Sequence, residues 1–234
     1  MAIYTLSDPH LSLSCEKPMD VFGGRWTNYV EKLSENLSKL SADDTLIMPG
    51  DISWAMHLDE LDADFGFLSS FPFRKIIGKG NHDYWWSTVS KLNKYISEKG
   101  FSNISFLYNN AYLVEDTVIS GSRGWYLDAA VAGCDNKKII ARECIRLDMS
   151  IKAGEKLCIE NGIVAPTVFM HYPPVHGDYV CGEIIDVLNA HGIKECYYGH
   201  LHGNCEQRLV ENYGGIHFTL CSADHLSFKP LKIN

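Results

Sequence analysis

Polar clusters follow five apolar segments that are spread over nearly the whole chain of 234 residues. Each apolar segment has the composition of a β-strand, and each cluster begins where its segment ends. Because the C-terminal ends of parallel strands meet at one edge of a sheet, the pattern predicts a fold that gathers the clusters into one site. The clusters are Asp8-Pro9-His10, Gly50-Asp51, Gly80-Asn81-His82-Asp83, His171 and Gly199-His200-Leu201-His202.

Strand-like and helix-like segments alternate along the chain. Apolar residues at spacings of three and four, such as Val30, Leu33 and Leu37, indicate amphipathic helices between the strands. We expect helices within 26–40, 58–68, 89–96, 140–151 and 184–188, the third ending at Gly100 and the fourth weakening at Gly154. The expected strands are 3–7, 45–48, 74–77, 112–114, 117–120, 167–170, 196–198, 207–210 and 216–220.

This order of elements predicts the α/β class, as a four-layer α/β/β/α sandwich of two mixed β-sheets flanked by helices. The chain has 46% apolar and 21% charged residues and contains no linker or low-complexity stretch. We therefore expect a single domain over residues 1–234.

Charge and cysteine content narrow the expected surroundings of the protein. A formal net charge of −8 argues against a broad basic face, so neither nucleic acid nor an anionic membrane is favoured as a partner. The first residues lead directly into a strand, without the basic flank and long apolar core of a signal peptide, which predicts a cytoplasmic location. The eight cysteines are widely spaced, which predicts reduced, mostly buried thiols.

Carboxylate, amide and imidazole side chains without a thiolate are typical ligands of a catalytic Mn, Fe, Co, Ni or Zn ion. The clusters supply more candidates than one tetrahedral ion accepts, but the number suits two ions that share a carboxylate. Asp51 follows a central strand and is the expected bridge. The candidate metal ligands are Asp8, His10, Asp51, Asn81, His171, His200 and His202.

Two divalent ions would give this acidic protein a local attraction for phosphate. With Asp8 and Asp51 as the only anionic ligands, the site keeps a formal charge of about +2. Paired ions also lower the pKa of bound water from about 15.7 towards about 7. The expected reaction is therefore hydrolysis of a phosphate ester by metal-bound hydroxide.

His82 directly follows the candidate ligand Asn81, so its imidazole is expected beside the metals. There it would donate a proton or hydrogen bond to the leaving oxygen or to a phosphoryl oxygen. Asp83 is expected to assist catalysis by orienting the His82 ring or raising its pKa.

At these residues the chain resembles the calcineurin-like metallophosphoesterases, whose pattern is D-x-H, G-D, G-N-H-[DE], H and G-H-x-H in this order. The resemblance covers roughly residues 1 to 220. It implies that Asp8, His10, Asp51 and His202 hold one metal, that Asp51, Asn81, His171 and His200 hold the other, and that His82 is the catalytic histidine.

The segments 50–56 and 81–86 are similar to a bacterial subgroup of predicted phosphohydrolases, and this likeness does not reveal the substrate. Pro9 departs from the family pattern, which has another residue type between the two ligands. Its ring is expected to favour extended backbone at Asp8 and removes one N–H donor near the metals.

Other residues near strand ends have two interpretations each. Arg123 is a candidate for binding a substrate phosphate or for a surface ion pair, and His176 for substrate contact or an ordinary polar role. Gly23-Gly24 suits a flexible flap or a simple turn. Aromatic residues near the clusters either wall the pocket or pack in the core: Trp54, Tyr84, Trp85, Trp86, Trp125 and Tyr126.

Together these features predict a phosphoesterase that uses two metal ions to hydrolyse a phosphomonoester or phosphodiester. A small or nucleotide-like substrate is favoured, because no added domain or basic stripe is present to hold a polymer. Two alternatives stay open, namely a nuclease of the same fold and a catalytically silent, metal-binding scaffold for protein interactions.

Overall fold

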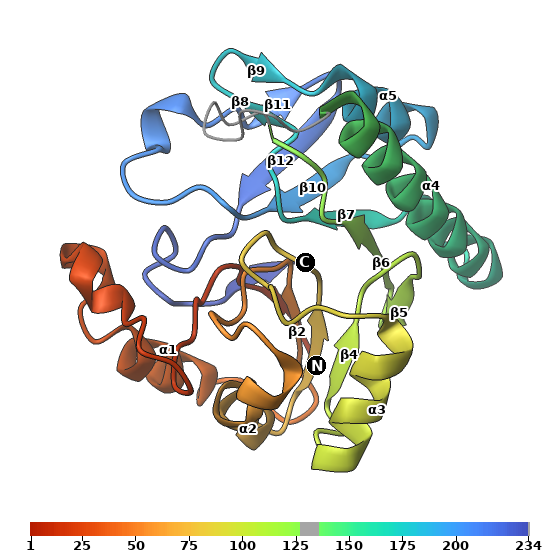
Figure 1. Ribbon diagram of the computed structural model, residues 1–234. Coiled ribbons are helices and arrows are strands. Elements are labelled where there is room, and N and C mark those ends of the chain that lie inside the picture. The colour runs from red at the N-terminus through yellow and green to blue at the C-terminus, as the bar shows by residue number, and fades with distance from the viewer. Residues whose placement is uncertain (127–135, 234) are drawn as a thin grey trace.

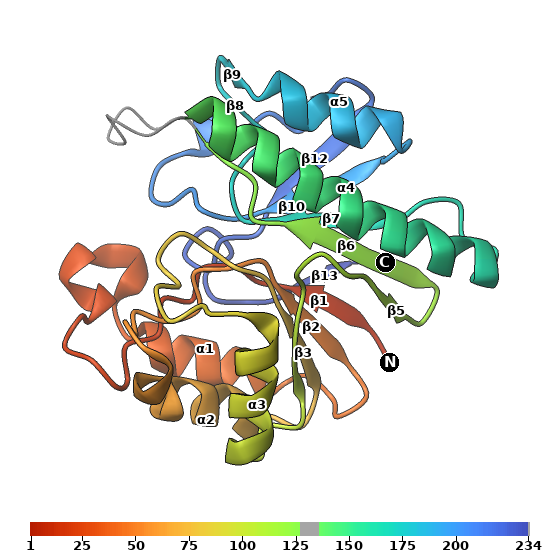
Figure 2. The same cartoon turned by 45° about the vertical axis from the view of Figure 1, so that its right-hand side comes forward.

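The computed structural model describes residues 1–126 and 136–233 of the chain. Two β-sheets lie face to face, with α1, α2 and α3 on the outer face of one and α4 and α5 on the outer face of the other (Figures 1 and 2). This arrangement confirms the predicted α/β/β/α sandwich. The helices are α1 (Tyr29–Leu37), α2 (Asp62–Ser70), α3 (Val89–Lys99), α4 (Asn136–Asn161) and α5 (Gly182–Ala190), with 3₁₀ turns η1 (Met19–Phe22), η2 (Gly24–Trp26), η3 (Leu58–Glu60) and η4 (Glu206–Arg208).

The first sheet has the strand order β13-β1-β2-β3-β4, and β1 to β4 run parallel. The second has the order β11-β12-β10-β7-β6-β5, and its four central strands run parallel. Strands β8 and β9 form a separate hairpin. The strands are β1 (Ile3–Thr5), β2 (Thr45–Met48), β3 (Arg74–Ile77), β4 (Ile104–Phe106), β5 (Tyr112–Val114), β6 (Thr117–Ser122), β7 (Thr167–Met170), β8 (Val175–His176), β9 (Tyr179–Val180), β10 (Glu195–Tyr198), β11 (Asn212–Tyr213), β12 (Ile216–Leu220) and β13 (Leu231–Ile233).

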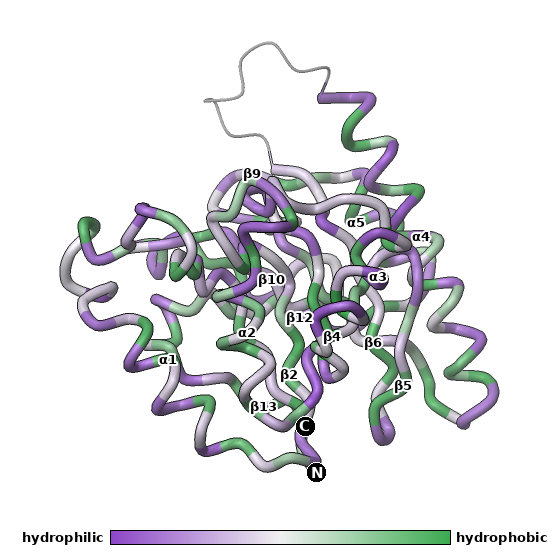
Figure 3. Tube along the Cα trace, turned by 60° about the horizontal axis from the view of Figure 1, so that its bottom comes forward, coloured by the Kyte–Doolittle hydropathy of each residue, from purple (hydrophilic) through white to green (hydrophobic). Residues whose placement is uncertain are grey.

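Alternating side chains of the strands build separate cores on the two faces of each sheet. In β2, Leu46 and Met48 pack in the core beneath the helices, whereas Ile47 joins the core between the sheets. In β7, Phe169 joins the same intersheet core while its neighbours face α4 and α5. Helix α4 alternates between hydrophilic and hydrophobic residues, as expected for a helix with one buried face (Figure 3). Both parallel sets of strands are thus fixed in register, and their C-terminal ends lie at a common rim.

Three sequence-based expectations for individual elements are wrong. Helix α4 does not weaken at Gly154 but continues to Asn161, because its buried face extends to Cys158. The segment 207–210 is not a strand: η4 occupies its start, and Leu209 and Val210 pack against the second core instead of pairing in the sheet. The apolar stripe 58–68 is divided into η3 and α2, because Glu60 accepts hydrogen bonds from the backbone before η3 and caps that turn separately.

Within the part of the chain that the structure describes, no helix is both long and apolar enough to cross a membrane. Cys134 lies outside the described residues. The other cysteines are free thiols; five of them are buried, namely Cys158, Cys181, Cys196, Cys205 and Cys221.

Lys75 is a fully buried cation on β3. Its ammonium donates a hydrogen bond to the Phe71 carbonyl and lies 4.3 Å from the centroid of the Phe73 ring. Burial lowers the pKa of Lys75 from its ordinary value of 10.5 to about 7. The Phe71 carbonyl also accepts a hydrogen bond of 2.7 Å from Asn103 Nδ2, so it keeps a donor if the lysine is replaced.

We expect Lys75→Met to stabilise the fold at neutral pH by on the order of 1 kcal/mol, because it removes a buried amine. In the unfolded chain Lys75 is protonated below about pH 10.4. In the folded chain it is protonated only below about pH 7. The wild-type free energy of unfolding therefore falls as pH drops between these values, and the gain from the variant is largest at and below pH 7. Denaturant unfolding at pH 7 and pH 10 measures this, and an equal or greater gain at pH 10 contradicts it.

Candidate metal centre

The predicted ligands all lie at the common rim of the two sheets. Each follows a parallel strand, which explains how residues from opposite ends of the chain come together. Asp8 and His10 follow β1, Asp51 follows β2, Asn81 follows β3, His171 follows β7, and His200 and His202 follow β10.

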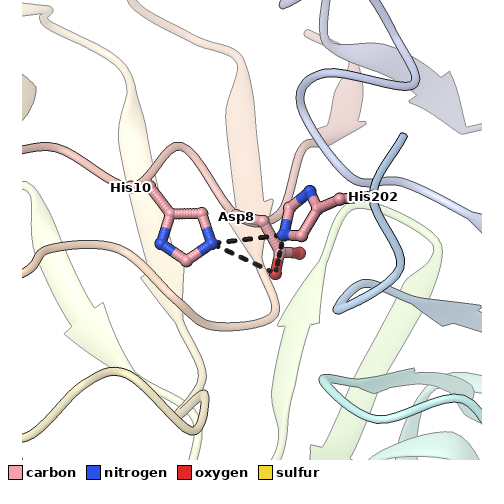
Figure 4. Close-up of side chains that lie close together, drawn as sticks. All are labelled: Asp8, His10 and His202. Atoms are coloured by element: carbon pink, nitrogen blue, oxygen red, sulfur yellow. Dashed lines mark hydrogen bonds and ion pairs between the residues drawn. The ribbon is translucent and has the colours of Figure 1, made fainter. Parts of the chain in front are cut away.

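Asp8, His10 and His202 form one group whose side chains point toward one another (Figure 4). The Nε2 atoms of the two histidines are 3.2 Å apart. Asp8 Oδ1 lies 3.6 Å from His202 Nε2 and 4.0 Å from His10 Nε2. Two ligand atoms that each lie about 2.1 Å from one ion are about 3.0 Å apart when the ligand–ion–ligand angle is a right angle. They are about 3.4 Å apart when this angle is tetrahedral. The spacing of this group therefore fits a shared cation.

Asp51, His171 and His200 form the second group. His171 Nε2 lies 3.5 Å from Asp51 Oδ2 and 2.6 Å from Asn81 Oδ1. Asn81 thus adds an amide oxygen to this group. The four residues that the family resemblance assigns to the second metal therefore lie together.

Asp51 connects the two groups through one oxygen atom. Its Oδ2 lies 3.5 Å from His171 Nε2 in the second group and 3.7 Å from His10 Nε2 in the first. Its other oxygen accepts a hydrogen bond of 2.7 Å from the backbone N–H of His82, which fixes the orientation of the carboxylate. This is the position expected of a bridging ligand.

The charges of the site also fit bound cations. Burial, together with the nearby carboxylates of Asp8 and Asp83, raises the pKa of Asp51 well above its ordinary value. A cation at this place would offset the repulsion between the buried carboxylates. Burial lowers the pKa of His10 to about 3 and also lowers the pKa of His171, so both imidazoles are held neutral, which is the form that binds metals.

Four of the predicted ligands have left-handed backbone conformations, with φ of 57° at Asp8, 47° at His10, 52° at Asp51 and 69° at His200. For residues other than glycine such strain costs about 1–3 kcal/mol each and is concentrated at functional sites. The extended backbone that we expected before Pro9 is therefore wrong. Hydrogen bonds from Asp8 N to the Gly50 carbonyl (2.9 Å) and from His10 N to the Asp51 carbonyl (3.1 Å) tie this turn to the loop after β2 instead.

Asp224 is a functional candidate that the sequence analysis missed. This buried residue lies after β12, and its Oδ1 is 2.7 Å from Nδ1 of His202. Its Oδ2 accepts a hydrogen bond of 2.9 Å from Gly203 N. Burial acts to lower the pKa of His202, but the hydrogen bonds to Asp224 and Asp8 raise this pKa to about 10. A carboxylate that holds the outer nitrogen of a histidine directs the inner nitrogen towards a metal.

The position of Asp224 was nevertheless visible in the sequence. It lies four residues after the predicted strand 216–220, just as the other clusters follow their strands. The segment Cys221-Ser222-Ala223-Asp224 contains neither a histidine nor a Gly-Asp pair, so it does not resemble the other clusters.

His82 lies beside the first group, with its ring centroid 5.5 Å from that of His10. Its buried Nδ1 has no hydrogen-bond partner among the described residues. Burial lowers the pKa of His82. The ring is therefore close to the candidate ligands, and one of its nitrogens is not used by the protein.

Asp83 does not orient the His82 ring, contrary to our expectation. Its oxygens instead accept hydrogen bonds from the backbone N–H groups of Asp51 (2.9 Å), Ile52 (2.8 Å) and Gly80 (2.7 Å). Burial raises the pKa of Asp83 to about 6, although these hydrogen bonds act to lower it. Asp83 thus joins the loops after β2 and β3 and positions Asp51.

Arg123 is directed towards a buried carboxylate. Its Nη2 lies 3.6 Å from Oε1 of Glu143, which is fully buried on α4 and also accepts a hydrogen bond of 2.6 Å from Arg146. The ion-pair interpretation of Arg123 therefore matches the structure, although the partner is buried rather than at the surface. His176 is also buried, and its Nδ1 lies 3.2 Å from the hydroxyl of Tyr126, whose ring contacts His200.

A cleft of about 770 Å³ opens beside the first group and His82. Trp54 and Gly23-Gly24 line it, whereas Trp85 and Trp125 pack in the cores. The lining residues are His10, Met19, Phe22, Gly23, Gly24, Arg25, Trp26, Trp54, His82, His202, Gly203, Asn204 and Asp224.

A family model described as calcineurin-like phosphoesterase matches residues 1–204. No curated protein matches the chain significantly. Among solved structures, a phosphopantetheinyl hydrolase from Mycobacterium tuberculosis is 15% identical, with 99% of this chain and 95% of that chain covered and a TM-score of 0.51. The protein TT1561 of Thermus thermophilus is 12% identical, with 99% and 97% covered and a TM-score of 0.53. At these identities the two structures support the fold alone.

We expect Gly80→Ala to lower metal affinity by at least about tenfold. A Cβ at Gly80 would overlap Oδ1 and the backbone nitrogen of Asp51 and displace this carboxylate. Gly66→Ala is the matched control, because Gly66 lies within α2 and a Cβ added there would meet open space. Isothermal titration calorimetry with Mn²⁺ measures the difference, and wild-type affinity in Gly80→Ala would contradict the assigned position of Asp51.

Asp224→Asn should lower the affinity of the group of Asp8, His10 and His202 for a cation by about 10–100-fold, because the charge that orients His202 is lost. The cation affinity of the group of Asp51, His171 and His200 should not change. Glu206→Gln provides a control, since Glu206 is an exposed carboxylate that pairs with Arg25 rather than with a candidate ligand. Metal titration followed by mass spectrometry under native conditions reads the occupancy, and two equally retained ions would show that Asp224 does not support a ligand.

Proposed function

Given that the chain belongs to the calcineurin-like phosphoesterase family and is a metal-dependent phosphoesterase, we propose that it hydrolyses a small phosphomonoester or phosphodiester with two divalent ions. The observation that carries the proposal is the position of Asp51 Oδ2, which is shared by the two ligand groups. A single-metal site would not require one oxygen within 3.5 Å and 3.7 Å of imidazoles from separate groups.

In this proposal one ion is held by Asp8, His10, Asp51 and His202. The other is held by Asp51, Asn81, His171 and His200. The mixture of oxygen and nitrogen ligands suits Mn, Fe, Zn, Co or Ni. When bound, such a pair activates water and neutralises charge on the phosphoryl oxygens.

His82 is proposed to donate a proton or hydrogen bond to the leaving oxygen. Its ring lines the cleft next to His10, so a phosphoryl group at the ligands would place its substituent within reach. Asp83 holds the backbone N–H of Asp51, the backbone N–H of His82 holds the Asp51 carboxylate, and neither group takes part in proton transfer.

The cleft favours a small substrate. Its volume of about 770 Å³ is within the range of small-molecule pockets. Its one lysine or arginine side chain, Arg25, is paired with Glu206, so the lining offers no cationic track for a polymer backbone. We therefore favour a small ester over nucleic acid.

The proposal predicts that protein stripped of metal and reloaded with Mn²⁺ hydrolyses aryl phosphate monoesters or diesters, and that Asp51→Asn abolishes turnover. Steady-state assays of both ester classes establish which is preferred. Full occupancy by two ions without turnover of any ester would instead support the scaffold interpretation. Cleavage of DNA or RNA with a steep salt dependence, together with inactivity on small esters, would support the nuclease.

His82→Ala should reduce kcat by about 10²–10⁴ while both ions stay bound, because it removes the donor to the leaving oxygen. His217→Ala is the control, since His217 is exposed on β12. Turnover and metal content are measured on the same samples. Unchanged turnover at full metal occupancy would exclude the proposed role of His82.

A further inference from the structure

We propose that the leaving group of the substrate is an uncharged apolar or aromatic group that binds against Phe22, Trp26 and Trp54. This inference rests on the proposed phosphoesterase function and specifies the class of ester. It follows from the residues that line the cleft, from the position of His82 within the cleft, and from the ion pair between Arg25 and Glu206.

The cleft has a polar end and an apolar wall. His10, His82 and His202 lie at the polar end, where the phosphoryl group would be held. The apolar wall is formed largely by η1 and η2, which lie at the edge of the molecule in Figure 1, and its Trp26 ring also packs against His10 and His202. Phe22 is 69% exposed although it lines the cleft. A bound apolar group would cover this ring and remove it from water.

Trp54 links the apolar wall to the proposed proton donor. Its ring stacks on His10 with centroids 5.0 Å apart and an interplanar angle of 26°, and its centroid is 4.3 Å from that of His82. Its Nε1 donates a hydrogen bond to Met19 Sδ at 3.3 Å, which fixes the indole against η1. A leaving group that takes a proton from His82 therefore lies beside the Trp54 ring.

The charges of the lining do not suit a second anionic group on the substrate. Among the described residues that line the cleft, Arg25 is the only lysine or arginine, and its Nη2 donates to Glu206 Oε1 at 2.7 Å and to Asn204 Oδ1 at 3.3 Å. Lys17 is exposed outside the lining, with its ammonium 5.2 Å from the centroid of the Trp54 ring. An anionic leaving group in the cleft would therefore reach Arg25 only in competition with Glu206, and would otherwise depend on Lys17, which lies outside the lining, so its burial is disfavoured.

The test compares phenyl phosphate, 2-naphthyl phosphate and 4-carboxyphenyl phosphate with the Mn²⁺-loaded protein. Phenol and 2-naphthol are similarly acidic, so the first two esters differ mainly in the apolar area of the leaving group. We expect kcat/KM to be about tenfold or more higher for the naphthyl ester than for the phenyl ester, and lowest for the carboxyphenyl ester.

Phe22→Ala should remove most of the advantage of the naphthyl ester. Val21→Ala is the matched control, because Val21 is 74% exposed on the same turn and is not among the residues that line the cleft. It should keep the wild-type ratio. Equal kcat/KM for the phenyl and naphthyl esters, a preference for the carboxyphenyl ester, or an undiminished ratio in Phe22→Ala would overturn the inference.

A binding experiment separates failure of this inference from failure of the proposed function. Naphthylmethylphosphonate and methylphosphonate cannot be hydrolysed, and calorimetry with the Mn²⁺-loaded protein measures their affinities without turnover. We expect the naphthyl compound to bind about tenfold more tightly, and Phe22→Ala to remove the difference. Tight naphthyl binding without hydrolysis of any ester would refute the enzyme activity and keep the apolar subsite, whereas equal affinities would refute the subsite.

Discussion

The structure of the site depends on a buried carboxylate that is shared by imidazoles from both sheets. Asp51 lies between His10 and His171, and its pKa is raised by burial and by neighbouring carboxylates. In the absence of compensating positive charge, this arrangement is unfavourable. The fold nevertheless holds it with a hydrogen bond from His82 N, backbone contacts of Asp83 and a strained φ at Asp51 itself. Such strain and desolvation are understandable if the site exists to bind cations.

The sandwich of two sheets is what makes this convergence possible. The first sheet contributes Asp8, His10, Asp51 and Asn81, whereas the second contributes the remaining histidines. Each ligand group therefore combines residues from both sheets, whose parallel strands end at one rim. The core between the sheets thus fixes the distances within each group as well as stabilising the fold. The apolar wall of the cleft is built differently, from the irregular segment before α1, and its Trp26 ring packs against His10 and His202.

The predicted ligands could be found from sequence because each combines a metal-binding side chain with a strand end, and both are local signals. Asp224 carries both signals but belongs to none of the five clusters, and its role depends on contact with His202 at the end of the neighbouring strand. The role of Asp83 could not be predicted, since it depends on the directions of backbone N–H groups from Asp51 and Gly80. Arg123 likewise required its tertiary partner Glu143 to be known. The strand expected at 207–210 failed because apolar residues that pack against a core from a loop have the same composition as a short strand.

The most direct measurement of the central claim is anomalous X-ray diffraction from crystals of the manganese-loaded protein. We predict two manganese peaks about 3.5–4 Å apart, one on each side of Asp51 Oδ2. A single peak, or a pair of peaks that Asp51 does not contact, would contradict the shared-carboxylate site.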